Sequence, residues 1–261
     1  MVQIKSAEDV ARMRKANHVV ARTLQLLGQH VQPGITTLEL DVIAENSIRK
    51  AGAKPAFKGY RGFPKTLCVS VNEEIVHGIP SHRKLKEGDI VGLDLGAIWD
   101  GFYGDAARTF AVGAISRTAQ RLIDVTRQSL EKAIDQVRPG KRIGDIGYAV
   151  QAYVESHGYS VVREFVGHGI GRNLHEDPQV PNYGKPGQGP RLKPGMVLAI
   201  EPMVCEGGPE VEMMKDNWTA VTRDRSLSAH FEHSVVVTEN GPVILSEIPE
   251  VEPALQPASV R

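Results

Sequence analysis

The sequence has little of what marks several specialised classes of protein. It has two cysteines in 261 residues, 5% aromatic residues and a formal net charge of zero. Cys68 and Cys205 lie far apart and form no Cys-x-x-Cys pair, which favours a reducing compartment over a disulfide scaffold. The balanced charge argues against a nucleic-acid or acidic-lipid partner, since such partners normally leave a basic excess.

Long hydrophobic runs are also missing. No run approaches the ~18 apolar residues of a membrane-spanning helix, and residues 1–9 lack the apolar core of a signal peptide. We therefore expect a cytoplasmic protein with no membrane and no DNA partner. The length and a hydrophobic content of 41% are sufficient for a full core in one large or two small domains.

Apolar residues at helical spacing predict two pairs of helices. The first pair covers about 6–28 and 38–50, and the second opens at Ser116 and at Asp145. Between the pairs, residues 57–112 alternate short β-rich runs with Gly, Pro and Asn turns, which indicates strands. The fold class predicted from this order is α+β.

The second part of the chain repeats features of the first. Val-Gln-Pro-Gly at 31–34 recurs as Val-Arg-Pro-Gly 106 residues later, and Leu-Lys-Glu-Gly at 85–88 matches Leu-Lys-Pro-Gly 107 residues later. Short Pro-Gly turns can match by chance. The second register, however, superposes Asp94 on Glu201, so each half presents a carboxylate at the same place.

The repeat predicts a single domain over residues 1–248. Its halves, about 1–115 and 116–248, would be related by a pseudo-two-fold axis, with a site in the crevice between them. Residues 249–261 are rich in proline, and we expect a flexible tail there.

Four carboxylates and one histidine occupy positions that are unusual for surface residues. Asp94 interrupts the apolar run 90–98, and Glu201 ends the run 196–201. Burying a lone carboxylate costs several kcal/mol or shifts its pKa until the group is neutral, so each needs a partner, and few basic residues are nearby. The rest of a plausible metal cage comes from Asp105, His168 and Glu232.

Four negative charges would offset two divalent cations. An oxygen-rich set with one imidazole suits Mn, Fe, Co or Zn, and a two-metal site can aim a shared water at a carbonyl or phosphoryl group. The turn at residues 99–101 fits a hairpin that brings Asp94 and Asp105 together. Taken singly, Asp94 could cap a strand end, Asp105 could be a turn residue and His168 a loop histidine.

Two further histidines follow apolar residues at turns, from which a side chain can point into a cleft. They are His77 and His175, and a histidine bonded to its own turn is the alternative for each. The remaining histidines that we considered lack such a context, and we expect them on the surface or in packing: His18, His30, His82 and His157.

Five motifs together carry a resemblance to a known enzyme family. They are Asn-Glu-Glu-Ile-Val-His-Gly-Ile-Pro at 72–80, Asp-Gly-Phe-Tyr-Gly-Asp at 100–105, Gly-His-Gly-Ile-Gly at 167–171, Glu-Pro at 201–202 and Glu-His-Ser at 232–234. Over about residues 4–246 the chain resembles the type I methionine aminopeptidases. It has room for neither the N-terminal extension of eukaryotic members nor the helical insertion of type II members, and so it resembles the bacterial ones.

The resemblance implies a pita-bread fold of two related halves. It also implies removal of the initiator methionine from deformylated nascent proteins that have a small second residue. Two divalent metal ions (Co, Mn, Fe or Zn) are implied, with a metal-bound hydroxide that attacks the scissile carbonyl. The implied ligands are Asp94, Asp105, His168, Glu201 and Glu232, of which Asp105 and Glu232 bridge.

The resemblance implies further roles around the metals. His175 would stabilise the oxyanion, His77 would bond near the scissile amide nitrogen, and Glu201 would help to move the proton. The implied methionine pocket consists of Tyr60, Phe63, Cys68, Leu174 and Trp218. Phe63 stands where Tyr is usual and Leu174 where Phe is usual, and both keep the pocket apolar, although ordinary core is the alternative for each. The implied partner is the N-terminal Met of nascent polypeptides, with the ribosome as a second candidate and the chain acting as a monomer.

Two alternatives stay open. An X-Pro aminopeptidase or prolidase shares the fold, but it usually has a large N-terminal domain and extra histidines near the site. A metal-free binding module on the same fold would act as a chaperone or adaptor, and it would typically have lost ligands that are all present here. Measuring the metal bound to protein purified without added cations distinguishes the binding module from the enzymes, because the binding module would contain none.

Overall fold

The structure, a computed structural model, describes residues 2–248, so the predicted tail lies outside the described residues. The helices are α1 (Ala7–His30), α2 (Thr37–Lys50), α3 (Arg117–Ile134) and α4 (Ile143–Ser156), with a short 3-10 helix η1 (Tyr60–Gly62). The strands before α3 are β1 (Lys54–Pro55), β2 (Leu67–Val71), β3 (Glu74–Val76), β4 (Ile90–Trp99) and β5 (Phe102–Ala111). Those after α4 are β6 (Ser160–Val161), β7 (Gly167–Gly169), β8 (Glu176–Val180), β9 (Val197–Ile200), β10 (Met203–Cys205), β11 (Val211–Met213), β12 (Ala220–Thr222), β13 (Ser228–His230), β14 (His233–Thr238) and β15 (Gly241–Ile244).

The helix starts follow from capping residues. At α1, the Asp9 amide donates to the Ser6 hydroxyl and the Ser6 amide donates to the Asp9 carboxylate, both at 3.1 Å. Helix α4 begins at Ile143, two residues before the predicted start. Asp145 is its third residue and accepts from the Arg142 amide at 2.7 Å, so this acidic residue marks the N3 position and not the cap.

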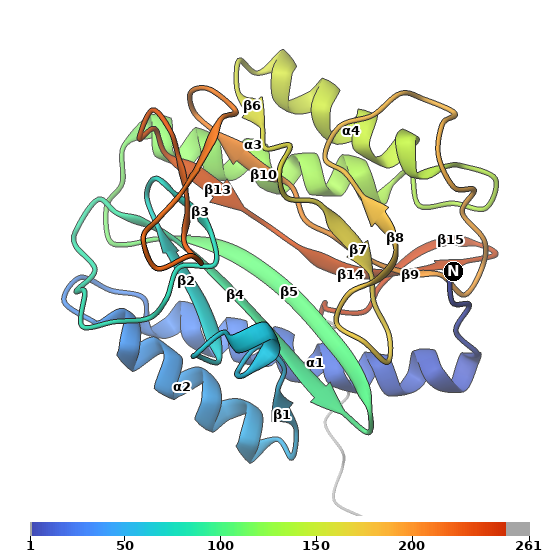
Figure 1. Cartoon of the computed structure of the whole chain (residues 1–261), viewed down its shortest axis with the longest axis horizontal. Helices are drawn as coiled ribbons and strands as arrows, with labels where there is room; N and C mark the ends of the chain where they lie inside the picture. Colours follow the sequence, from blue (N-terminus) through green and yellow to red (C-terminus); the bar gives the residue numbers. More distant parts are fainter. Residues whose placement is uncertain (1, 249–261) are drawn as a thin grey trace, which may run out of the picture.

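The two helix pairs lie on opposite outer sides of the molecule, and the strands run between them (Figure 1). Within residues 2–248 the strands form four sheets, ordered β1-β4-β2 with β5 on β4, β13-β10-β6, β11-β12-β3 and β15-β14-β9-β7-β8. One apolar core packs α1 and α2 on β2 and β4, and another packs α3 and α4 on β9 and β14. None of the helices described combines the length and hydropathy needed to cross a bilayer.

The predicted repeat has matching backbone features. Gly34 and Gly140 both take left-handed φ angles, of 94° and 90°, which glycine adopts without steric cost. Two residues after each glycine, an isolated antiparallel bridge joins the chain to a later segment of the same half. Thr36 pairs with Lys84 in the first half, and Arg142 pairs with Arg191 in the second. The fold is α+β with two related halves, while the domain limits stay a prediction.

Candidate metal centre

Five acidic or imidazole side chains converge on one cavity between the halves. Asp94 lies in β4 and Asp105 in β5, whereas His168 lies in β7. Glu201 directly follows β9, and Glu232 lies between β13 and β14. Each half therefore contributes carboxylates to the cavity, as the register of the repeat predicts.

The alternation of side chains along β4 and β5 places Asp94 and Asp105 on the same face of the sheet. In β4 the odd-numbered residues from Val91 to Ala97 are buried against the helices, so Asp94 faces the other side of the sheet. The β4–β5 hairpin pairs Asp94 with Ala107 and Gly96 with Asp105. Asp94 and Asp105 are thus diagonal neighbours on one face, and the predicted hairpin is confirmed.

The same alternation of side chains along strands positions the residues of the second half. His168 in β7 pairs with Ala199 in β9. Glu201 follows Ala199 by two residues, so it points to the side that His168 occupies. The Glu232 amide donates to the Ala107 carbonyl at 2.9 Å, which ties the connection between β13 and β14 to the first half.

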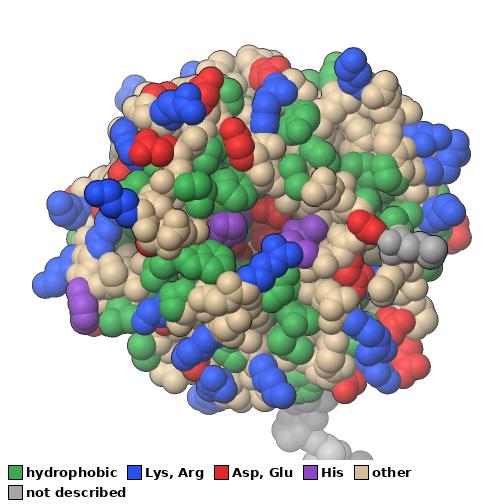
Figure 2. Space-filling model, in the orientation of Figure 1, with side chains coloured by type: hydrophobic (Ala, Val, Ile, Leu, Met, Phe, Trp, Pro, Cys, Tyr) green, Lys and Arg blue, Asp and Glu red, His purple; other side chains and the backbone are tan. Residues whose placement is uncertain are grey.

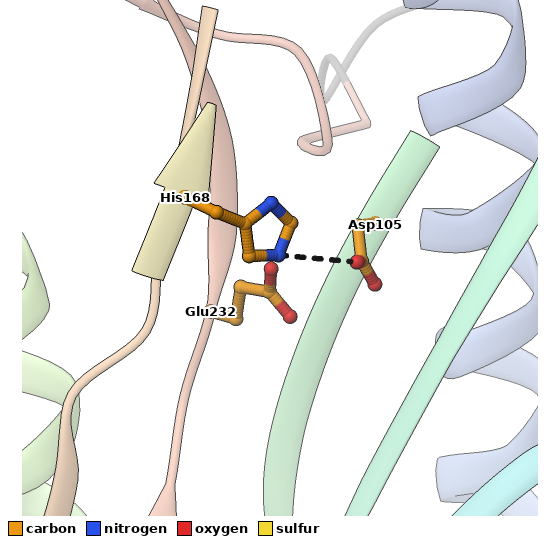
Figure 3. Close-up of side chains that lie close together, drawn as sticks. All are labelled: Asp105, His168 and Glu232. Carbon is orange, nitrogen blue, oxygen red and sulfur yellow. Dashed lines mark ion pairs between the residues drawn. The ribbon is translucent and has the colours of Figure 1, made fainter. Parts of the chain in front are cut away.

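Potential donor atoms of four of the five residues lie close to one another. Atoms of Asp105, His168 and Glu232 lie within 4.8 Å of one another, and Figure 3 shows the three side chains pointing into a common space. His168 Nε2 lies 3.9 Å from Asp105 Oδ2 and 3.7 Å from Glu201 Oε1. His168 Nδ1 donates to the Gly169 carbonyl at 2.9 Å, which leaves Nε2 free to ligate.

Electrostatics test whether this cluster suits a cation. Burial raises the pKa of Asp94 and of Glu201 to about 7. It raises the pKa of Asp105 and of Glu232 well above the usual range, and neighbouring carboxylates add to the shift of these two groups. Among the described residues, Asp94 Oδ1, Asp105 Oδ1 and Glu232 Oε1 are buried with no hydrogen-bond partner. Crowded carboxylates with unpaired oxygens fit divalent metal ions.

The two histidines predicted to face substrate line the same cavity. The backbone of His77 is left-handed, with φ at 63°, and its ring meets Phe165 edge to face. The ring of His175 lies 4.2 Å from that of His168, and its Nδ1 lies 2.8 Å from the Tyr60 hydroxyl. Desolvation lowers the pKa of His77 and of His175 to about 4, so both are neutral near pH 7.

Apolar side chains form the other wall of the cavity, whose volume is about 150 Å³. Phe63 and Trp218 meet edge to face with centroids 5.2 Å apart. Burial raises the pKa of the Cys68 thiol, so this residue acts as an apolar wall. All the residues predicted for the site line the cavity: Tyr60, Phe63, Cys68, His77, Asp94, Asp105, His168, Leu174, His175, Glu201, Trp218 and Glu232.

Residues that the sequence analysis missed also belong to the site. His230 is buried, and its Nε2 lies 3.6 Å from Glu201 Oε2. It precedes Glu232 by two residues, and that spacing in extended backbone could have indicated it. Arg61 is the one Lys or Arg among the described residues that line the cavity, and Figure 2 shows basic and histidine side chains around the central hollow.

Known proteins are similar to this chain over nearly all of the described residues. The model of metallopeptidase family M24 matches residues 11–239. A methionine aminopeptidase 1 from Bacillus subtilis is 53% identical over 248 residues, which cover 95% of this chain and all of that protein. The structure of a methionine aminopeptidase from Thermotoga maritima superposes with a TM-score of 0.94 at 49% identity, over 95% of this chain and all of that one. A prolidase from Pyrococcus furiosus, at 22% identity and a TM-score of 0.76, covers 95% of this chain and 66% of its own and shares the fold.

Proposed function

The chain belongs to metallopeptidase family M24, and from that premise we propose that it removes the amino-terminal methionine of polypeptides. Its resemblance to the bacterial type I methionine aminopeptidases is confirmed by relatives that match it nearly end to end. The pita-bread fold is confirmed as well. The reaction is hydrolysis of the first peptide bond by a metal-dependent enzyme.

One observation carries this proposal beyond family membership. The buried carboxylate cluster and an apolar wall border the same cavity of about 150 Å³. An unbranched thioether side chain suits such a wall, and the adjoining carboxylates suit metals. A methionine side chain in the apolar part therefore places the following carbonyl beside the cluster.

Two divalent ions of Co, Mn, Fe or Zn complete the proposed site. Asp105, Glu232 and His168 have atoms within 4.8 Å of one another and would hold the ions together, and the resemblance implies that the two carboxylates would be shared between them. The other ligands are Asp94 and Glu201. When bound, the ions supply the Lewis acidity that activates water for attack on the scissile carbonyl.

The protein side chains orient the substrate and move the proton. His175, neutral and held by Tyr60, donates toward the carbonyl oxygen as negative charge develops there. His77 bonds near the scissile amide nitrogen. The Glu201 carboxylate accepts a proton from the attacking water and returns it to the leaving amine.

The proposal extends to partners and place. We propose that the chain acts as a monomer. The substrates are deformylated nascent polypeptides with a small second residue, which the ribosome presents, and their place of action is the cytoplasm. Co-sedimentation with ribosomes tests the proposed association with the ribosome.

A panel of peptides tests the function itself. Met-Gly, Met-Ala and Met-Ser starts should be cut, whereas Met-Lys and Met-Phe starts should resist. A formyl group removes the free amine and adds bulk against the carboxylates, so formyl-Met peptides should also resist. A first Leu in place of Met should lower kcat/KM about 10–200-fold, because it changes the fit to an apolar pocket.

The same panel separates the alternatives. Equal cleavage of Met-Ala, Met-Lys and Leu-Ala starts would indicate a general aminopeptidase. Preferred cleavage of Ala-Pro starts would indicate the X-Pro class, which shares the fold. Absence of bound metal together with absence of hydrolysis would leave the binding module.

A further inference from the structure

The segment before α1 packs against the loop that carries His175. Lys5 lies in this segment, and its side chain is only 6% exposed. Its ammonium group donates to a carboxylate oxygen of Glu176, whose side chain is 4% exposed. Glu176 is the residue directly after His175, so a buried ion pair adjoins a residue of the proposed catalytic machinery.

The other oxygen of Glu176 holds the loop together. It accepts from the amides of Arg172 at 2.9 Å and Asn173 at 3.1 Å. One carboxylate therefore closes the turn 172–176 and bonds Lys5 at the same time. Hydrogen bonds to an ionised acceptor are stronger than neutral ones, so the carboxylate keeps this turn in shape while it stays charged.

Close packing leaves Lys5 little freedom. A Cβ added at Gly171 would lie 2.3 Å from Lys5 Cε and 2.8 Å from Glu176 Oε1. The Lys5 amide donates to the Gly195 carbonyl at 2.8 Å, which fixes the main chain of the same residue. The lysine is thus held at its backbone and at its ammonium group, and the loop is fitted around it.

We propose that Lys5 is a positioning residue for the aminopeptidase reaction, through Glu176 and the loop that carries His175. The inference rests on the proposed function. Removing the ammonium group leaves a buried carboxylate without its cation, and the loop relieves this by moving toward water. His175 then loses its placement against Tyr60 and His168, and a displacement of ~1 Å at a reacting group can cost ~10²-fold in rate.

The test begins with Lys5→Met in the full chain, loaded with Mn²⁺. On a Met-Ala-Ser peptide we expect kcat to fall about 10-fold or more, with KM and bound Mn²⁺ unchanged, since the loop and not the ligands has moved. Lys58→Met is the matched control, because Lys58 pairs with Glu45 at 2.8 Å but is 47% exposed. That variant should retain the kcat of the unmodified protein.

A double-mutant cycle supplies the readout that a merely structural role would not move. In a His175→Ala background, Lys5→Met should change kcat less than about twofold, because the residue it positions is gone. Equal losses in both backgrounds, or no loss from Lys5→Met, would overturn the inference. If Lys5→Met fails to fold, Glu176→Gln removes the charge from the other side and must show the same non-additivity. Failure of the unmodified protein to cleave Met-Ala-Ser would instead overturn the proposed function.

Discussion

The two halves share a scaffold but position their candidate metal ligands in different ways. In the first half, Asp94 and Asp105 lie on the paired ten-residue strands β4 and β5. In the second half, His168 lies in a three-residue strand, and Glu201 and Glu232 lie between strands. Local pairing positions the first set, whereas the second set depends on contacts with distant segments. A repeated scaffold can thus keep one carboxylate per half while the surrounding loops diverge.

Metal removal should give the largest effect, because the proposed site takes ligands from both halves. Strong chelation should abolish hydrolysis of Met-Ala-Ser, and Mn, Co or Fe should restore it. Asp94→Ala in one half and Glu201→Ala in the other should each lower bound metal, measured by plasma mass spectrometry, since each leaves positive charge underneutralised. Full activity of metal-free protein would contradict the proposed dinuclear site. Unchanged bound metal in one of the two variants would show that the carboxylate replaced in it is not a ligand.

The same contrast explains what the sequence could predict. Asp94 interrupts one apolar run and Glu201 ends another, and the repeat places the two at equivalent positions, so both were identifiable from the sequence pattern. His230 was missed because its significance depends on its 3.6 Å approach to Glu201, a residue distant in the sequence. The Lys5 pairing with Glu176 was equally invisible, since no local pattern relates residues so far apart.

The helices were predictable for a similar reason. Capping residues and periodic apolar positions are short-range signals, and they identified all four helix starts to within two residues. The short strands of the second half, such as β7 and β10, carry too few residues for a period to show. Their pairing is set by tertiary contacts, which no sequence window contains.

Deleting a substrate-facing histidine should have the next largest effect, and it separates roles within the second half. His175→Ala should keep both metals and lose about 10²–10³ in kcat, the usual cost of removing one preorganised oxyanion donor. His168→Ala should instead weaken metal binding. The measurements are kcat and metal content of the two variants side by side. Similar metal contents in both variants would show that this division of roles is wrong.

The junction between halves should contribute a smaller, measurable stability. The buried Ser234 hydroxyl donates to the Asp105 carbonyl at 2.9 Å, across the interface. Ser234→Ala should lower the free energy of unfolding by about 1–3 kcal/mol, because it leaves a buried carbonyl without its donor. Urea denaturation measures the change. Ser156→Ala is the matched control, since its hydroxyl bonds the Tyr153 carbonyl at 2.8 Å on the exposed surface of α4, and about 0.5 kcal/mol or less is expected there.

The smallest expected effect concerns the mouth of the cavity, where the first half contributes a charge. Arg61 is exposed and has a left-handed φ of 48°, and its guanidinium lies 5.4 Å from the Tyr60 ring centroid. Because Arg61 lines the cavity and is exposed, we expect it to lie near the third or fourth residue of a substrate whose first methionine occupies the cavity, and an acidic residue there should be favoured. Exposed pairs contribute roughly 0–1 kcal/mol, which corresponds to at most about a fivefold gain in kcat/KM for Met-Ala-Asp over Met-Ala-Lys.

Arg61→Gln should remove that preference while cleavage of Met-Ala-Ser continues. Raising the salt concentration should reduce the preference in the unmodified protein, since exposed charges are screened over about 8–10 Å at ordinary ionic strength. The measurement is kcat/KM for the two charged peptides at low and high salt. A preference for Met-Ala-Asp that survives both Arg61→Gln and high salt would assign it to another group. The charge of Arg61 would then have no part in peptide selectivity at the mouth of the cavity.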